Sequence, residues 1–324
     1  MIKSIKPYQT IGIVGISKNT GKTTTLNALI HHFHQERLGL TSIGLDGEVL
    51  DQVNFLPKPQ IGVYTNMVIA TTQACLDVSS ATFHILEETP FLTALGRVFI
   101  VKIDKPGTVM IAGPTSNHEM NMLLAMMKKY VDRIFVDGAL SRKTFSAMTE
   151  LDGIVLATGA AFSPSMEETV AKTKQIIETF SYPKTTLDIK SSYSIVMKNK
   201  DHLIVLENKS TESIYEALKV MSEDLEFIYI RGALTERILN LLIQLRIKNF
   251  KLICEDPSKF MISHQQADVF KKLNIDVEVL KPCPLILITV NPFRPTGDSY
   301  DEMTFIKRIK ELTDIQVINV KDRW

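Results

Sequence analysis

The feature that most constrains this chain is a glycine-containing turn between a short apolar run and an amphipathic helical pattern. Residues 15–23 are interpreted as a phosphate loop of the kind G-x-x-x-x-G-K-[ST], which ends here in Gly-Lys-Thr. Residues 11–16 have the apolar character of a buried strand, and residues 26–33 carry apolar side chains at helical spacing. Gly39 is interpreted as the stop of that helix. Because a turn between strand and helix directs backbone N–H groups at one point, the stretch predicts a nucleoside triphosphate site.

Each residue type in the loop has a chemical role. Gly15 and Gly21 allow the backbone to turn and to approach the phosphates without a Cβ atom between them. Lys22 is expected to reach the β- and γ-phosphates, and the hydroxyl of Thr23 is expected to bind Mg²⁺. The residues predicted to contact the nucleotide are Gly15, Ser17, Lys18, Asn19, Thr20, Gly21, Lys22, Thr23 and Thr24.

Acidic residues follow two further strand patterns, where ligands bind in open α/β sheets. Asp137 follows the strand predicted at residues 133–136, of which 134–136 are apolar, and is interpreted as a Walker-B-like aspartate that holds Mg²⁺ through water, or alternatively as a turn cap. Asp46 and Glu48 follow the strand predicted at residues 41–45 and offer a second metal contact, or form a solvated acidic turn. The predicted catalytic residues are Lys22, Asp137 and Asp46, and the predicted metal ligands are Thr23, Asp137, Asp46 and Glu48.

Strand and helix patterns alternate along almost the whole chain, which predicts an α/β fold with a mostly parallel sheet. The polar, proline-containing segment 181–186 is the best boundary candidate. We therefore predict a P-loop NTPase domain over residues 1–185 and a smaller α/β domain for partner binding or coupling over residues 186–324. Residues 51–96 show no clear pattern and are predicted to be an insertion over the nucleotide site.

Two helices are predicted together with the residues that begin them. A helix is expected over residues 117–130, where Ser116 and Glu119 have capping-box spacing, and another over residues 166–180, after Ser165. Both helices would start at the ligand-binding edge of the sheet. Helix capping therefore explains these serine and glutamate residues without a role in ligand binding or catalysis.

Composition narrows the functional classes. With 37 basic and 36 acidic residues, the formal net charge of +1 gives no bulk attraction to nucleic acid. The three cysteines lie far apart and form neither a metal motif nor a disulfide framework, which is typical of a reducing compartment. The N-terminus lacks the apolar core of a signal peptide, and no run approaches the length of a membrane span. The expectation is a cytoplasmic protein that binds neither nucleic acid nor membrane.

Several stretches, taken together, resemble one known family. They are residues 15–24, 44–48, 136–143 and 156–160, with Asn291-Pro292-Phe293, Pro295 and Gly297 in the C-terminal half. The combination is similar to the lysine 5,6-aminomutase reactivase subunit (KamB-like), a P-loop NTPase family encoded beside adenosylcobalamin-dependent aminomutases.

The resemblance implies an ATP-driven helper with ATP and Mg²⁺ as its cofactors. Such a protein uses nucleotide binding and hydrolysis to loosen a stalled aminomutase that holds damaged cobalamin, together with a MutS-like ATPase partner. ATP is favoured over GTP because residues 208–211 lack the aspartate of the guanine motif N-K-x-D. Two alternatives stay open: an ATP-dependent ligase or kinase for a small carboxylate, resembling dethiobiotin synthetase, and a non-hydrolysing assembly protein that senses nucleotide.

Overall fold

The chain forms two compact units. The computed structural model describes residues 3–43, 61–139, 151–207, 210–221, 223–262 and 264–322. Unit 1 combines Met1–Thr173 with Leu285–Trp324, and unit 2 is Lys174–Pro284. Asp46 and Glu48, which were predicted to bind metal, lie outside the described residues.

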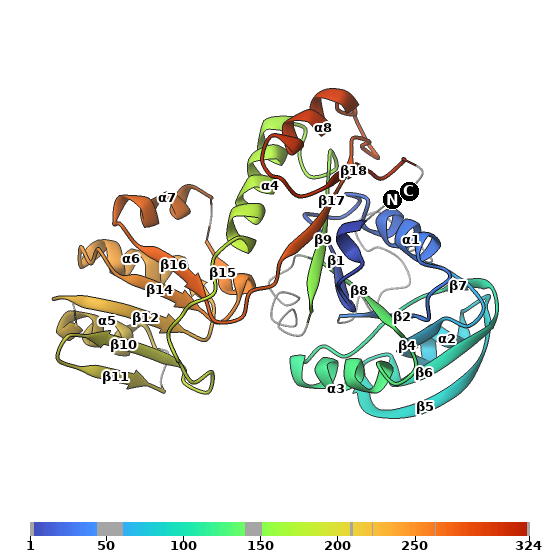
Figure 1. Ribbon diagram of the computed structural model, residues 1–324, viewed down its shortest axis with the longest axis horizontal. Helices are drawn as coiled ribbons and strands as arrows, with labels where there is room; N and C mark the ends of the chain where they lie inside the picture. The colour runs from blue at the N-terminus through green and yellow to red at the C-terminus, as the bar shows by residue number, and fades with distance from the viewer. Residues whose placement is uncertain are drawn as a thin grey trace. The chain divides into compact units, whose positions relative to one another are not determined.

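Unit 1 is built on a nine-stranded sheet in the order β18-β17-β9-β1-β8-β2-β4-β6-β5 (Figure 1). The bounds of its strands are β1 Thr10–Gly15, β2 Leu38–Ser42, β4 Val68–Thr72, β5 Thr82–Thr93, β6 Gly96–Lys105, β8 Arg133–Ala139, β9 Gly153–Gly159, β17 Leu285–Asn291 and β18 Val317–Asn319. A separate two-stranded sheet joins β3 (Ile61–Val63) to β7 (Gly107–Val109). The helices are η1 Lys3–Ile5, α1 Lys22–His32, α2 Gln73–Asp77, α3 Asn117–Met127, α4 Met166–Phe180 and α8 Glu302–Lys310.

The large sheet is mostly parallel, as predicted. Every neighbouring pair from β18 across to β4 runs parallel, and only the pairs β4–β6 and β6–β5 at one edge are antiparallel. All residues of β1 and of β9 are buried, which is the expected state of central strands covered on both faces. Since parallel strands end at one edge, the carboxyl ends of β1, β8, β9 and β17 lie together there.

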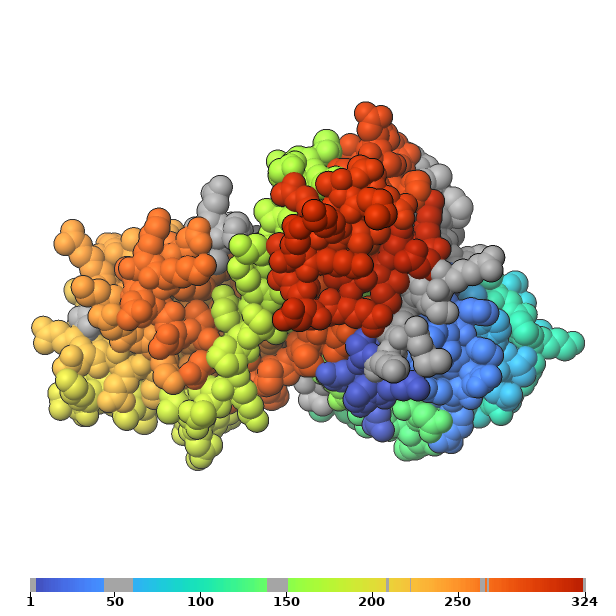
Figure 2. Space-filling model, turned by 45° about the horizontal axis from the view of Figure 1, so that its top comes forward, coloured from blue at the N-terminus to red at the C-terminus, as the bar shows by residue number. Residues whose placement is uncertain are grey.

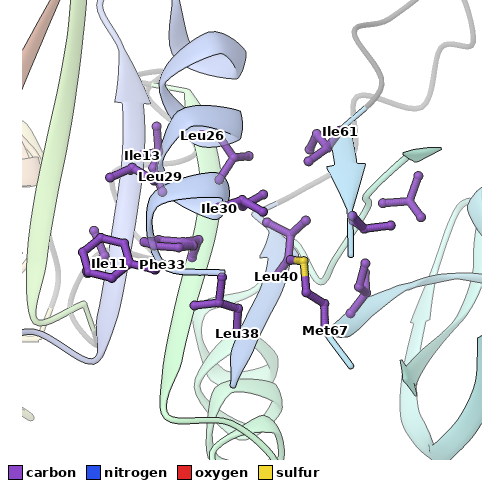
Figure 3. Close-up of a cluster of buried hydrophobic side chains, with 14 of the residues drawn as sticks. Ile11, Ile13, Leu26, Leu29, Ile30, Phe33, Leu38, Leu40, Ile61 and Met67 are labelled. Atoms are coloured by element: carbon purple, nitrogen blue, oxygen red, sulfur yellow. The ribbon is translucent and has the colours of Figure 1, made fainter. Parts of the chain in front are cut away.

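The core beside α1 fixes that helix against the sheet. Apolar residues recur every three or four positions along α1 and are buried, which is the amphipathic pattern expected from the sequence. Figure 3 shows their side chains between the helix and strands β1 and β2; the contributing residues are Leu26, Leu29, Ile30, Phe33, Ile11, Ile13, Leu38 and Leu40. Burial of each such side chain stabilises the fold by about 1.5–3 kcal/mol, so the start of α1 is held firmly.

Gly39 does not stop α1, which corrects the prediction. The helix ends at His32, and Gly39 lies inside β2, which itself begins at Leu38 rather than at residue 41. A Cβ atom at Gly39 would lie 3.0 Å from Val131 and 3.2 Å from Ile134. The glycine is therefore explained by close packing within the sheet rather than by a helix end.

The predicted insertion at residues 51–96 is also wrong for its described part. Within residues 61–96, β4 and β5 join the large sheet, and β5 forms a long antiparallel pair with β6. Three shifts of register interrupt that pair. Each shift breaks the period-two alternation by which a strand is recognised in a sequence, so the pattern was lost.

Unit 2 is a smaller α/β unit with a five-stranded sheet in the order β11-β10-β12-β14-β16. The pairs β11–β10 and β10–β12 are antiparallel, whereas β12, β14 and β16 run parallel. Its elements are β10 Ile195–Asn199, β11 Leu203–Leu206, α5 Thr211–Met221, β12 Leu225–Ile230, β13 Leu234–Thr235, α6 Glu236–Gln244, β14 Lys251–Cys254, η3 Pro257–Lys259, β15 Phe260–Met261, α7 His264–Lys272 and β16 Asp276–Val279. Residues of α5, α6 and α7 share one hydrophobic core with the sheet.

The division of the chain differs from the predicted domains 1–185 and 186–324. The boundary falls within α4, between Thr173 and Lys174, and the chain returns to unit 1 at Leu285. Strands β17 and β18 then complete the large sheet beside β9. A strand that joins a distant sheet looks the same in sequence as one that stays in its own domain, so the alternating pattern gave no sign of this return.

No helix among the described residues is both long enough and apolar enough to cross a membrane.

Candidate phosphate-binding site

The loop between β1 and α1 has the backbone geometry of a phosphate-binding turn. β1 ends at Gly15, and α1 begins at Lys22 after Gly21, which has φ 97° and ψ 10°. This left-handed conformation is open to glycine at little cost and strained for other residues. No side chain of the described residues caps α1, and its first turn contains no acidic residue. The N–H groups that begin the helix are therefore available to an anion.

One fixed position of the predicted motif does not match. Five residues separate Gly15 from Gly21, one more than in G-x-x-x-x-G-K-[ST], so that Ile16 stands where the pattern has its first glycine. The interpretation of residues 15–23 as this motif is therefore wrong at its first glycine, whereas Gly21, Lys22 and Thr23 occupy their expected positions. Asn19, at φ 61°, takes a left-handed conformation within the longer loop.

Hydrogen bonds inside the loop hold its shape. The Thr20 hydroxyl donates to the carbonyl oxygen of Ser17 at 2.9 Å, and the Ser17 hydroxyl donates to the carbonyl oxygen of Lys18 at 3.2 Å. A Cβ atom at Gly15 would lie 2.8 Å from the Thr20 hydroxyl oxygen, so this first glycine makes room for the bond. Lys18 and Asn19 are exposed, while Thr20 is buried. The shape of the loop is thus supported by hydrogen bonds among its own residues.

The structure brings together Lys22 and Asp137, the two residues that the sequence singled out on separate elements. Lys22 Nζ lies 3.2 Å from Asp137 Oδ1 and 3.3 Å from Oδ2. Asp137 is in β8, in register with Ile13 of β1 and Ser42 of β2, near the carboxyl ends of three strands. The side chains of Lys22 and Asp137 are 26% and 18% exposed, so the pair is reachable from solvent but partly shielded from it.

The side-chain oxygen atoms at this site are suitable ligands for a Mg²⁺ ion that a nucleotide also binds. Thr23, which is half-buried on the first turn of α1, offers a hydroxyl, and Asp137 offers a carboxylate. Within the described ranges, no group of three His, Cys, Asp or Glu side chains could hold a metal by itself. Mg²⁺ is commonly bound through one or two protein oxygens and the substrate phosphates, which fits a set of this size.

Asn291 belongs to the site although it was not predicted there. This last residue of β17 donates from Nδ2 to the carbonyl oxygen of Asn19 at 3.4 Å. Gly21 and Gly159 lie close beside it, since a Cβ atom on Gly21 would be 3.1 Å from Asn291 Cβ and one on Gly159 would be 2.7 Å from its carbonyl oxygen. Sequence reasoning had placed residue 291 in the second domain. The signal that could have found it is its position directly after an apolar strand.

No family model matches the chain, and no curated protein matches it. Among solved structures it is similar to a ParA family ATPase from Chlorobium tepidum TLS, at 15% identity and a TM-score of 0.30, over 54% of this chain and 70% of that one. It is also similar to the MinC:MinD cell division protein complex of Aquifex aeolicus, at 13% identity and a TM-score of 0.26, over 85% and 81% of the two chains. For pnob8 ParA the identity is 12% and the TM-score 0.28, over 66% and 72%.

At these TM-scores the likeness carries no argument about this chain. The fold class is instead seen in the protein itself. A loop with an uncapped helix start joins β1 to α1, and β1 lies among parallel strands whose ends surround the loop. The predicted α/β fold with a mostly parallel sheet is confirmed, and its first strand is followed by a loop of the phosphate-binding type.

Proposed function

We propose that this protein binds ATP together with Mg²⁺ at the loop between β1 and α1, and that it hydrolyses the nucleotide. One observation carries the proposal: the Lys22 ammonium lies at the uncapped start of α1 and is held by Asp137, 3.2 Å away. A cation and converging backbone N–H groups are what a polyphosphate requires, and the carboxylate beside them is what a bridging metal requires.

Binding then amounts to an exchange of partners. Lys22 gives up the Asp137 carboxylate for the β- and γ-phosphate oxygens, and Asp137 becomes free to orient a water in the Mg²⁺ shell. During hydrolysis the Lys22 ammonium and the N–H groups of α1 stabilise the charge that develops on the departing phosphate. The Thr23 hydroxyl and, through water, the Asp137 carboxylate would hold Mg²⁺, which would neutralise charge on the phosphate oxygens.

A direct test is calorimetric titration of the protein with ATP and Mg²⁺. Lys22→Ala is expected to weaken binding about 100-fold, which is about 2.8 kcal/mol at the usual ~1.4 kcal/mol per tenfold. Lys128→Ala, which removes an exposed lysine directly after α3, is the matched control and should bind as the unaltered protein does. Equal affinity of the Lys22 variant and the control would contradict the proposal.

We also propose that the ATPase cycle serves to reactivate an adenosylcobalamin-dependent aminomutase, with a MutS-like ATPase as partner. The support is the resemblance described above, and the parts of its stretches that the structure describes meet at one sheet edge: Gly15 is in register with Ala139 and Ala157, and Asn291 with Gly159. A loop edge of this kind can differ between nucleotide states, because the γ-phosphate contacts several loops at once.

The role can be tested with an aminomutase that holds an inactive cobalamin. The expected result is cobalamin release that requires ATP, this protein and its partner, and that fails with Lys22→Ala. ATP turnover that appears only when a small carboxylate is added would instead favour the ligase or kinase alternative. Nucleotide binding without turnover under any of these conditions would favour a nucleotide-sensing assembly protein.

A further inference from the structure

Two polar side chains of strand β17 contact the phosphate loop and the helix that follows it. Thr289 Oγ1 and Thr25 Oγ1 lie 2.7 Å apart, and both residues are fully buried. Two residues further along, Asn291 Nδ2 donates to the carbonyl oxygen of Asn19 at 3.4 Å. One strand therefore contacts the loop at Asn19 and the helix that follows the loop at Thr25.

The contact with Thr289 affects the start of α1, because Thr25 belongs to the first turn of this helix. The Thr25 N–H donates to the carbonyl oxygen of Gly21 at 2.8 Å and thereby closes the first turn of the helix. Lys22 and Thr23 lie within this turn. A bond that fixes the Thr25 side chain thus fixes the direction in which the helix start and its lysine face the phosphates.

The segments involved are distant in sequence, because Thr25 and Thr289 are 264 positions apart. Between them the chain forms all of unit 2 before it returns at Leu285 to unit 1. In the space-filling view the red atoms of the C-terminal residues lie against the blue atoms of the N-terminal residues (Figure 2), in agreement with the hydrogen bond from Asn291 to Asn19.

A second threonine pair provides a built-in comparison. Thr158 Oγ1 of β9 and Thr173 Oγ1 of α4 also lie 2.7 Å apart, and both residues are fully buried. The same two hydroxyl groups meet as in the pair formed by Thr25 and Thr289, and Thr173 Oγ1 also donates to the carbonyl oxygen of Thr169 at 2.8 Å. The element that is tied differs, since Thr158 holds α4 and Thr289 holds the helix that begins at the phosphate loop.

We propose that Thr289 and Asn291 are positioning residues of the phosphate site: they hold the loop and the first turn of α1 in the geometry that binds the triphosphate. This inference rests on the proposed nucleotide binding. A buried hydroxyl that loses its partner favours any rearrangement that restores a hydrogen bond, so removal of Thr289 Oγ1 releases the helix start from its fixed direction. Neither residue needs to touch the transferred phosphate to have this effect.

The test compares Thr289→Val with Thr158→Val, since each variant removes one hydroxyl from a buried threonine pair without a change of shape. The affinity for ATP with Mg²⁺ and the melting temperature are measured for both and for the unaltered protein. Both variants are expected to lower the melting temperature, Thr158→Val by less, because Thr173 Oγ1 keeps its bond to the carbonyl oxygen of Thr169. Only Thr289→Val should weaken nucleotide binding, by roughly 3- to 10-fold, the effect of one hydrogen bond.

Two further variants separate positioning from general damage. Thr289→Ser keeps the hydroxyl and should restore most of the affinity, and Asn291→Ala should weaken binding while leaving the threonine pair intact. If the unaltered protein binds nucleotide but the Thr289 and Thr158 variants lose affinity equally, or neither loses any, the positioning role is overturned. If the unaltered protein does not bind, the proposed function fails first and this inference falls with it.

Discussion

Arg133 is the buried charged residue with the most extensive set of contacts in the described part of unit 1. Its guanidinium donates to the Glu36 carboxylate at 2.8 Å and to the carbonyl oxygens of Ile5 and Tyr8. The same group lies 4.7 Å from the centre of the Phe33 ring. With 7% of its side chain exposed, Arg133 pins the segment before β1 to the start of the sheet. Its charge is tolerated because every direction offers an acceptor or an aromatic face.

Arg133→Met is expected to lower the free energy of unfolding by about 2–4 kcal/mol, because the Glu36 carboxylate and two backbone carbonyls lose their donor. Arg37→Met is the matched control: its pair with Asp132 is 66% and 52% exposed, so solvent replaces the contact and stability should change little. Urea denaturation of both variants measures the difference. If both variants lost the same free energy of unfolding, burial of Arg133 would not be the reason that its contacts stabilise the fold.

At the scale of elements, two helices, α3 and α4, begin at the residues that the local sequence predicted. Ser116 is the N-cap of α3: its hydroxyl oxygen accepts from the Glu119 N–H at 3.3 Å, and its O–H donates to the Glu119 carboxylate at 2.8 Å. Ser165 likewise accepts from the Glu168 N–H at 3.3 Å before α4. Both predicted caps are confirmed, since a capping box needs only residues three apart in the chain.

Ser116→Ala should lower the free energy of unfolding by about 1 kcal/mol, the usual effect of an N-cap oxygen. Ser116→Asn retains an acceptor for the Glu119 N–H and should keep most of that stability. Chemical denaturation followed by circular dichroism compares the two variants with the unaltered protein. An alanine variant as stable as the asparagine variant would show that the cap contributes nothing here.

At the scale of the whole molecule, the two units should differ in their response to alkali. Burial raises the pKa of Tyr182, assisted by Glu178, and that of Tyr229, assisted by Glu255, each to about 12 from an ordinary value of 10.0. Both tyrosines lie in unit 2. Between these pH values the unfolded chain has lost phenolic protons that the folded unit keeps, so the free energy of unfolding falls as the pH rises from about 10 to about 12.

Tyr229→Phe should reduce this alkaline loss of stability. It should be harmless at neutral pH, because the Tyr229 hydroxyl is buried without a hydrogen-bond partner among the described residues. Urea unfolding at several pH values from neutrality to about 11.5 checks the expectation, with absorbance of ionised tyrosine as a second readout. A Phe variant whose stability falls with pH as steeply as that of the unaltered protein would contradict it.

The sequence by itself determined those parts of the structure that depend on interactions between residues close together in the chain. The strand, turn and helix around Lys22, the strand that ends near Asp137 and the caps at Ser116 and Ser165 follow from periodicity and short-range hydrogen bonds. These act over a few residues, so a pattern of a few residues reports them.

Only the tertiary structure decided which distant segments meet. It placed β17 beside β9, brought Asn291 to the phosphate loop and Thr289 to the first turn of α1, and put the unit boundary inside α4. Strand order is set by the free energy of packing whole elements together. An apolar strand carries no mark of the sheet that it will join, and for this reason the second half of the candidate site could not be found from the sequence.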